Sequence, residues 1–201
     1  MHPAVIVIDM IVDFTTGRLG SPQARAIRPA IKRLLNAARR KKIPVIYSQD
    51  SHLPTDPEMK VWGPHGMFGT KGAQTDPQLK PKAGEMVIPK HVLDIFFGNN
   101  LEDVLKEHRI DTVILAGVAT ELCVQHGAGG AAFRGLKGIV AKECVAPLDP
   151  SVQEAALRYM KRAYGTAIAS LGSVLKMVAK TKRISSFVQK ESLVSSAGRA
   201  R

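Results

Sequence analysis

The stretch that decides the fold is TVILAGVATELCVQHGA, residues 112–128. Its first part, Thr112–Ala116, is a continuous apolar run typical of a buried strand. After a short Gly-containing segment, residues 121–125 have the pattern of a beginning helix. A strand that leads into a helix places Cys123 at the carboxyl edge of a sheet, where open α/β folds hold their sites. A helix amino terminus also favours thiolate over thiol, so we expect this segment to supply an activated nucleophile.

Strand-like and helix-like segments alternate along the rest of the chain. The predicted strands are 3–8, 44–48, 86–88, 112–116, 138–145 and 166–169. The predicted helices are 22–38, 101–108, 121–133, 149–160 and 173–179. This alternation predicts an α/β fold with three layers, αβα, around a mostly parallel, Rossmann-like sheet of six strands. Residues 51–83 are rich in Pro, Gly and Asp without a clear period, and such a long irregular segment in a compact domain is usually functional.

Length and composition indicate one globular domain. The 201 residues are 45% hydrophobic and 23% charged, and we assign residues 1–180 to the domain and 181–201 to a basic, Ser- and Lys-rich tail. No apolar run is long enough to span a bilayer, and residues 1–8 do not have the pattern of a secretory signal. The two cysteines, Cys123 and Cys144, do not form a disulfide framework. We therefore expect a cytoplasmic protein without a membrane partner.

The net charge of +12 raises the question of a nucleic-acid partner. Residues 176–201 hold seven Lys or Arg against one Glu, which is half of the excess, and the remaining excess is spread over many predicted helices. No basic cluster alternates with aromatic residues as in proteins that bind single strands. Nucleic-acid binding is therefore not expected to be the main role, although a basic binding module remains an alternative.

Polar residues at strand ends are candidates for a site, and each has an ordinary alternative. Asp9 ends the first predicted strand and could equally cap the following turn, which is the role we expect of Asp13. Lys90 follows the third strand, where a solvated lysine is also common. Cys123 could be an inert buried cysteine or a redox-sensing thiol. His126, one helical turn later, could pair with it but is expected to pack on the helix.

A possible metal site follows the second strand. Asp50 and His52 point the same way on an extended segment, and His65 lies in the irregular region. One carboxylate and two imidazoles suit zinc, with manganese or iron as alternatives. Asp56 and Glu58 are possible additional ligands, either directly or through water, and the ordinary alternative is a capping Asp with two loop histidines.

The combined motifs resemble the isochorismatase-like cysteine hydrolases, and within them the nicotinamidases. The matching segments are VIDMIVDF, SQDSH, WGPHGMFGTKGAQTDPQLKP, VIPK followed by FFGN, and LAGVATELCV, and they occur in the family's order. The resemblance implies a catalytic triad of Asp9, Lys90 and Cys123. In it, Asp9 takes the thiol proton and passes it to the leaving amine, and Lys90 holds Asp9 and stabilises negative charge. Cys123 attacks an amide carbonyl and forms a thioester that water hydrolyses.

The resemblance also implies how a substrate is held. A cis peptide bond before Ala119 turns the N–H groups of Ala119 and Cys123 toward the substrate oxygen. The divalent metal on Asp50, His52 and His65 lies beside the triad and can hold a pyridine nitrogen. Residues that match the family's pocket walls are Phe14, Trp62 and Phe96.

The activity that the resemblance implies is hydrolysis of nicotinamide to nicotinate and ammonia, in a homo-oligomer such as a dimer or tetramer. The alternative is another small amide or carbamoyl substrate. Two departures from the family pattern leave that alternative open: residues 93–96 read Leu-Asp-Ile-Phe where many relatives have Tyr-Ser-Ala/Gly-Phe, and Gly66 stands where many nicotinamidases have Cys.

Overall fold

The centre of the protein is a sheet of six parallel strands, seen in a computed structural model that describes residues 1–181. The strands are β1 (Pro3–Ile8), β2 (Val45–Asp50), β3 (Met86–Lys90), β4 (Thr112–Val118), β5 (Lys137–Ala146) and β6 (Ala167–Ala169). Their order across the sheet is β3-β2-β1-β4-β5-β6, and every neighbouring pair is parallel. The predicted α/β fold is confirmed, and the sheet is wholly parallel in the described residues.

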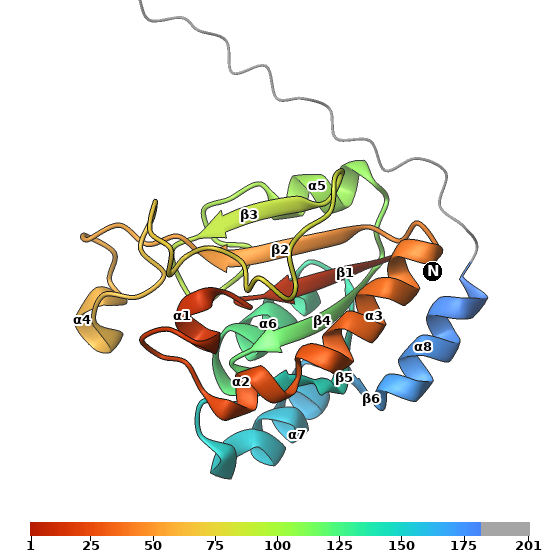
Figure 1. The fold of residues 1–201 in the computed structure, drawn as a ribbon. Coiled ribbons are helices and arrows are strands. Elements are labelled where there is room, and N and C mark those ends of the chain that lie inside the picture. The colour runs from red at the N-terminus through yellow and green to blue at the C-terminus, as the bar shows by residue number, and fades with distance from the viewer. Residues whose placement is uncertain (182–201) are drawn as a thin grey trace, which may run out of the picture.

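Helices cover both faces of the sheet, which gives the three predicted layers (Figure 1). One face carries α2 (Pro22–Ala26), α3 (Arg28–Arg40) and α8 (Leu171–Lys180). The other carries α5 (Leu101–Glu107), α6 (Gln125–Phe133) and α7 (Gln153–Tyr164). Three short elements, α1 (Val12–Thr15), α4 (Met59–Trp62) and the 3-10 turn η2 (Pro150–Val152), lie in the connections.

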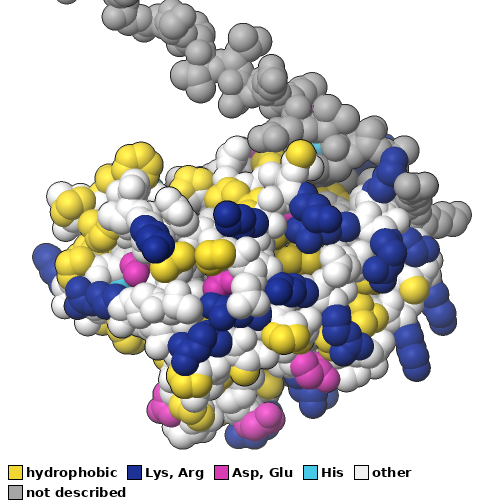
Figure 2. Space-filling view, viewed as in Figure 1, with side chains coloured by type: hydrophobic (Ala, Val, Ile, Leu, Met, Phe, Trp, Pro, Cys, Tyr) yellow, Lys and Arg dark blue, Asp and Glu magenta, His cyan; other side chains and the backbone are white. Residues whose placement is uncertain are grey.

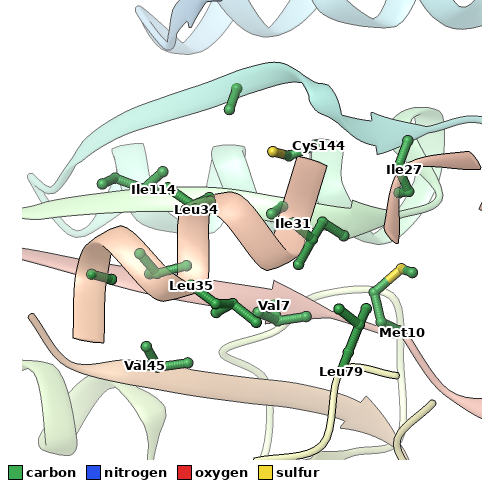
Figure 3. Packing of buried hydrophobic residues seen from close by; sticks show 14 of the residues in the cluster. Val7, Met10, Ile27, Ile31, Leu34, Leu35, Val45, Leu79, Ile114 and Cys144 are labelled. Carbon is green, nitrogen blue, oxygen red and sulfur yellow. The ribbon is translucent and has the colours of Figure 1, made fainter. Parts of the chain in front are cut away.

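Hydrophobic residues on both faces of the strands explain why the sheet is buried between two helical layers. Every residue of β1 and β2 is buried, so neither strand has a solvated face. On α3, the apolar residues at helical spacing (Ile31, Leu34 and Leu35) are fully buried against the sheet (Figure 3). The predicted helical period after Ser21 is thus confirmed, and the Ser21 side chain accepts a hydrogen bond from the Ala24 N–H.

Element boundaries differ from the prediction where local conformation interrupts a period. The predicted helix 22–38 is two helices, because Ile27 separates α2 from α3 and Pro29 restarts the helix in its first turn. The predicted helix from Asp149 begins as the turn η2 and becomes regular only at Gln153. The irregular segment 51–83 contains only the short helix α4. The predicted tail 181–201 lies outside the described residues except for Thr181.

The strand order reverses direction between β1 and β4, and that reversal opens a crevice at their carboxyl ends. Gly117, near the end of β4, allows the two strands to meet closely there. Its φ is +122°, and a Cβ at this position would lie 1.9 Å from the Ile8 carbonyl oxygen. A residue with a side chain cannot occupy this point, which directly precedes the Cys123 turn and faces the end of β1.

On the face of the described residues that Figure 2 shows, positive charge does not form a single stripe. Figure 2 shows Lys and Arg side chains dispersed over one face, with hydrophobic and uncharged groups between them. Within residues 1–181, no helix has the length and apolarity that a transmembrane span requires.

Candidate active site

Cys123 lies in an irregular turn between β4 and α6. This turn, η1, covers Thr120–Val124, and Leu122 within it has non-helical angles of φ −116° and ψ −105°. The predicted helix over residues 121–133 is interrupted rather than continuous, because the backbone kinks at Leu122 within the irregular helical turn η1, and the regular helix α6 begins at Gln125. The predicted cis peptide bond is present between Val118 and Ala119.

Lys90 brings the three predicted catalytic residues together. Its Nζ lies 2.9 Å from Asp9 Oδ2 and 3.5 Å from Cys123 Sγ, and it also contacts the carboxylate of Asp50. Asp9 Oδ1 accepts the Asp50 N–H at 2.8 Å, and the Asp9 carboxylate interacts with the Cys123 thiol. Asp9 and Lys90 are fully buried, and Cys123 is 4% exposed. Asp9, Lys90 and Cys123, which lie at or beyond the carboxyl ends of three different strands, are therefore close enough to act on one substrate atom.

Burial and mutual charge set the protonation of this cluster. Burial and the neighbouring Asp50 raise the pKa of Asp9 to about 6, although Lys90 opposes the rise. Burial would lower the pKa of Lys90, but Asp50 and Asp9 raise it well above its usual range. Burial also raises the pKa of the Cys123 thiol well above its usual range, with Lys90 opposing and the carboxylates adding to the rise. Burial therefore outweighs the helix amino terminus at Cys123, and the nearby Asp9 carboxylate is a base that could take the thiol proton.

The candidate metal ligands Asp50, His52 and His65 converge beside this cluster. Each offers one ligand atom, and the three atoms lie within 4.8 Å of one another. His52 Nε2 is 3.5 Å from Asp50 Oδ1, and His65 Nε2 is 3.7 Å from Asp50 Oδ2. The spacing and the donor types fit a divalent ion such as zinc.

Both imidazoles direct Nε2 toward the Asp50 carboxylate, where the three candidate ligand atoms converge. His65 Nδ1 lies 2.7 Å from the Gly63 carbonyl oxygen, and His52 Nδ1 lies 3.1 Å from Asp56 Oδ2. Both acceptors require a hydrogen on Nδ1, which leaves the Nε2 lone pair for a metal. The buried His52 Nε2 has no hydrogen-bond partner among the described residues, which is the state expected of a ligand atom.

The two possible additional ligands have different positions. Asp56 contacts His52 at Nδ1, on the side away from the converging atoms, so the prediction of Asp56 as a direct ligand is wrong. Glu58 Oε2 lies 3.9 Å from His52 Nε2 and remains a candidate.

A narrow cavity of about 20 Å³ borders Cys123. Polar and reactive groups on its wall are Asp50, Glu58, His65 and Cys123. Its apolar wall consists of Phe14, Leu19, Trp62, Leu93, Ala119, Leu122 and Leu148. Two of the three predicted pocket aromatics and both residues predicted to hold the substrate oxygen, Ala119 and Cys123, therefore border the same space.

Phe96 does not line this cavity, so its prediction as a pocket wall is corrected. The ring packs in the core below α6, where a Cβ on Gly130 would lie 2.7 Å from Phe96 Cδ2. The guanidinium of Arg134 covers the ring at 4.4 Å from its centroid. Leu93, three residues earlier in the same segment, takes a place in the cavity wall instead.

Comparison with known proteins identifies the family. The family model described as the Isochorismatase domain matches residues 3–171, which include every residue of the site. The chain belongs to the isochorismatase family. It is a hydrolase that acts on the C–N bonds of amides, as members of this family do.

Relatives within the family carry several activities in their names. An N-carbamoylsarcosine amidase of Arthrobacter sp is 32% identical over 165 residues, 75% of this chain and 62% of the relative, so the chain spans less than two thirds of that protein. The crystal structure of N-carbamoylsarcosine amidase from Thermoplasma acidophilum is 37% identical with a TM-score of 0.81, covering 85% of this chain and 97% of that one.

Two other similar structures are those of a nicotinamidase and a pyrazinamidase. Nicotinamidase PncA from Bacillus subtilis is 30% identical with a TM-score of 0.79, covering 85% of this chain and all of that one. Pyrazinamidase of Pyrococcus horikoshii in complex with zinc is 25% identical with a TM-score of 0.78, covering 85% of this chain and 99% of that one.

Sequence reasoning missed several residues that shape the site of this amidohydrolase. Leu148 and Leu19 reach the cavity from loops with no motif, so no sequence signal indicated them. Glu121 accepts hydrogen bonds from the N–H groups of Leu148 and Asp149 at 2.8 and 3.1 Å. Asp13, predicted as a cap, accepts the Gly66 N–H at 2.8 Å, so it anchors the loop of His65. The sequence signal for this role of Asp13 was its position in the motif VIDMIVDF.

His126, close to Cys123 in sequence, and Cys144, the second cysteine, both have structural rather than catalytic positions. His126 Nδ1 lies 2.9 Å from the Leu122 carbonyl oxygen, as expected for a histidine packed on its helix. Cys144 is fully buried in the core on the α3 side of the sheet, as predicted (Figure 3).

Proposed function

We propose that this amidohydrolase is metal-dependent and converts nicotinamide and water to nicotinate and ammonia. The observation that carries the proposal is that Asp50 and His65, two of the three candidate ligands, line the same cavity as Cys123. A divalent ion held by Asp50, His52 and His65 supplies a Lewis acid beside the nucleophile and a coordination position for a ring nitrogen. Zinc is the first candidate, with manganese and iron as alternatives.

The triad then carries out the reaction in two steps, formation of a thioester on Cys123 and its hydrolysis. Asp9 takes the proton of Cys123 as the sulfur attacks the amide carbon, and the N–H groups of Ala119 and Cys123 receive the developing oxyanion. Asp9 returns this proton to the amine, the C–N bond breaks, and ammonia leaves a thioester on Cys123. Asp9 then removes one proton from water as the water oxygen attacks the thioester, that proton returns to the sulfur as the C–S bond breaks, and the released acid loses its remaining proton to solvent to give nicotinate. Lys90 balances the charge of Asp9 throughout.

The cavity wall favours a neutral, flat substrate. Phe14 and Trp62 offer aromatic faces, and no Lys or Arg is among the described residues that line the cavity. A substrate that carries a carboxylate would find no Lys or Arg side chain among these lining residues to pair with. Nicotinamide is uncharged and brings only an amide and a ring nitrogen.

The second candidate function is hydrolysis of a small N-carbamoyl acid. The specific observation in its favour is Arg18, whose guanidinium nitrogen would lie 2.8 Å from a Cβ on Gly63, next to the cavity residue Trp62. This exposed cation, whose chain neighbour Leu19 also lines the cavity, could receive a substrate carboxylate. The N-carbamoylsarcosine amidases among the relatives support the same class of substrate.

Ammonia release from nicotinamide and from N-carbamoylsarcosine distinguishes these two functions. The wild-type protein, Cys123→Ala and Cys144→Ala are assayed after metal analysis and again after chelation. We expect nicotinamide turnover in the wild type and in Cys144→Ala, loss in Cys123→Ala, and loss on chelation that zinc reverses. Equal rates in the wild type and Cys123→Ala would contradict the mechanism. Turnover of N-carbamoylsarcosine alone, abolished in Arg18→Ala, would replace nicotinamide with the second candidate.

A further inference from the structure

The carboxylate of Asp56 forms a hub behind the candidate metal site. Its Oδ2 lies 3.1 Å from His52 Nδ1 and 3.0 Å from His91 Nδ1, and it accepts the Leu53 N–H at 2.9 Å. The Asp56 side chain is 12% exposed, and neither Asp56 nor His91 lines the cavity. Asp56 therefore cannot touch substrate, and any effect on the reaction must pass through another residue.

The contact with His52 determines what that imidazole offers to a metal. A carboxylate accepts hydrogen bonds only, so His52 carries a hydrogen on Nδ1 and a lone pair on Nε2. A charged acceptor also makes the imidazole a more basic ligand and fixes the plane of its ring. His65 differs in this respect, because its Nδ1 donates to the neutral carbonyl of Gly63. His52 is thus the one of the two histidines with a carboxylate behind it.

The contact with His91 reaches a second part of the site. His91 directly follows Lys90 at the end of β3, whereas Asp56 belongs to the irregular segment after β2. One carboxylate therefore holds both the loop of the metal ligands and the residue next to the triad lysine. The His91 side chain is 43% exposed, so this arm is weaker than the arm to the fully buried His52.

We propose that Asp56 is a positioning residue that sets the metal affinity of this site by fixing the tautomer and orientation of His52. The inference rests on the metal site of the proposed function, and it is independent of which amide is hydrolysed. Loss of a carboxylate behind a ligating histidine typically weakens metal binding 10- to 100-fold. Asp56 acts mainly through His52, and His91 is an auxiliary contact.

Zinc affinity measured by competition with a chromophoric chelator tests the inference on the full-length protein. We expect Asp56→Asn to bind zinc about 10- to 100-fold more weakly than the wild type. Asn keeps an oxygen for the Leu53 N–H, so the melting temperature of the metal-free protein should not change. His91→Ala keeps the bond between Asp56 and His52 and should stay within about threefold of the wild type. Asp103→Asn, at an exposed position on α5, is the matched control and should bind normally.

Each outcome of this experiment has one meaning. Asp56→Asn that binds zinc as the wild type does would overturn the inference. An equal loss in Asp56→Asn and His91→Ala would also overturn it, because Asp56 would then act by joining two segments rather than through His52. A wild-type protein that binds zinc but does not hydrolyse nicotinamide refutes the proposed substrate, and the loss in Asp56→Asn still supports the inference. A wild-type protein that binds none of zinc, manganese or iron refutes the metal site and the inference with it.

Discussion

Asp50 and Lys90 lie opposite each other on β2 and β3, and their side chains are in direct contact. The same ammonium group lies 2.9 Å from Asp9, so one buried cation stands between two buried carboxylates. One of these carboxylates is the proposed general base, and the other is a candidate metal ligand. The proposed nucleophile and the candidate metal site therefore share a charge network, and a change in one must affect the other.

Replacement of Lys90 tests this network. Lys90→Met keeps much of the side-chain length but leaves Asp9 and Asp50 buried without a counter-charge. We expect the free energy of unfolding to fall by about 3–5 kcal/mol, since an uncompensated buried charge is costly, and ammonia release to fall at least about a thousandfold. Urea unfolding of the metal-free protein and an ammonia assay measure the two effects.

The control for Lys90→Met is Lys106→Ala, which removes an exposed partner of Glu102 at i,i+4 spacing. Its cost should stay below about 1 kcal/mol because solvent screens such pairs. A Lys90→Met protein as stable as the Lys106→Ala protein would show that the buried network has no energetic role.

Gly66 gives a second prediction, at one of the departures from the family pattern. Its φ is +50°, and a Cβ there would lie 2.7 Å from Asp50 Cβ. Gly66→Ala should cost about 1–2 kcal/mol from the left-handed backbone alone and should also displace Asp50. Gly69→Ala is a matched control, because Gly69 has a φ of +76° with nothing within 4 Å of a Cβ. We expect about tenfold weaker zinc binding in Gly66→Ala only, and equal affinities in both variants would contradict the displacement of Asp50.

The ends of parallel strands explain why much of the site could be predicted from sequence. Asp9 follows β1, Lys90 ends β3 and Cys123 follows β4, and the carboxyl ends of parallel strands meet at one edge of the sheet. Apolar runs reveal such strands, so their final residues are predictable without knowing any contact. Asp50, at the end of β2, follows from the same reasoning.

Residues in loops and turns could not be placed in this way. The helical pattern of residues 121–125 does not indicate a break at Leu122, because a single unusual pair of backbone angles leaves the pattern unchanged. The family resemblance predicts Phe96 in the pocket wall, but the direction of its ring depends on the space left by Gly130 and on Arg134, both distant in sequence. The role of Asp56 depends likewise on a fold of the loop that brings it behind His52.

Glu121 supports a third prediction, concerning the cavity wall. Its Oε1 accepts two N–H groups and thereby holds Leu148 against the turn that carries Cys123. Glu121→Ala should release this loop, raise KM about tenfold through the lost apolar contact and leave zinc affinity unchanged. Steady-state kinetics measure the effect, and Glu154→Ala on the exposed side of α7 is the control. A fall in kcat with unchanged KM would instead indicate that Glu121 acts on the nucleophile turn itself.

The buried pair of Arg28 and Asp76 gives the fourth prediction, which separates stability from catalysis. Arg28 lies in the first turn of α3 and contacts the carboxylate of Asp76, which also accepts the Gln78 N–H at 2.8 Å. The Asp76 N–H donates to the Met10 carbonyl at 2.8 Å. Asp76 therefore links the loop of residues 74–79 to α3 through its side chain and to Met10, next to Asp9, through its backbone. Asp76→Asn leaves the largely buried Arg28 without its counter-charge, and we expect the free energy of unfolding to fall by about 3 kcal/mol.

Because this pair does not border the cavity, kcat at a temperature where Asp76→Asn is folded should change less than about tenfold, unlike in Lys90→Met. A double-mutant cycle with Arg28→Met isolates the interaction, since removal of both charges leaves neither of them buried and unpaired. The double variant should therefore be more stable than the sum of the two single losses implies. Additive losses would mean that the two charges do not interact, and residues 74–79 would then be held by their other contacts, such as the Asp76 N–H to the Met10 carbonyl and the Tyr47 hydroxyl to the Leu79 carbonyl.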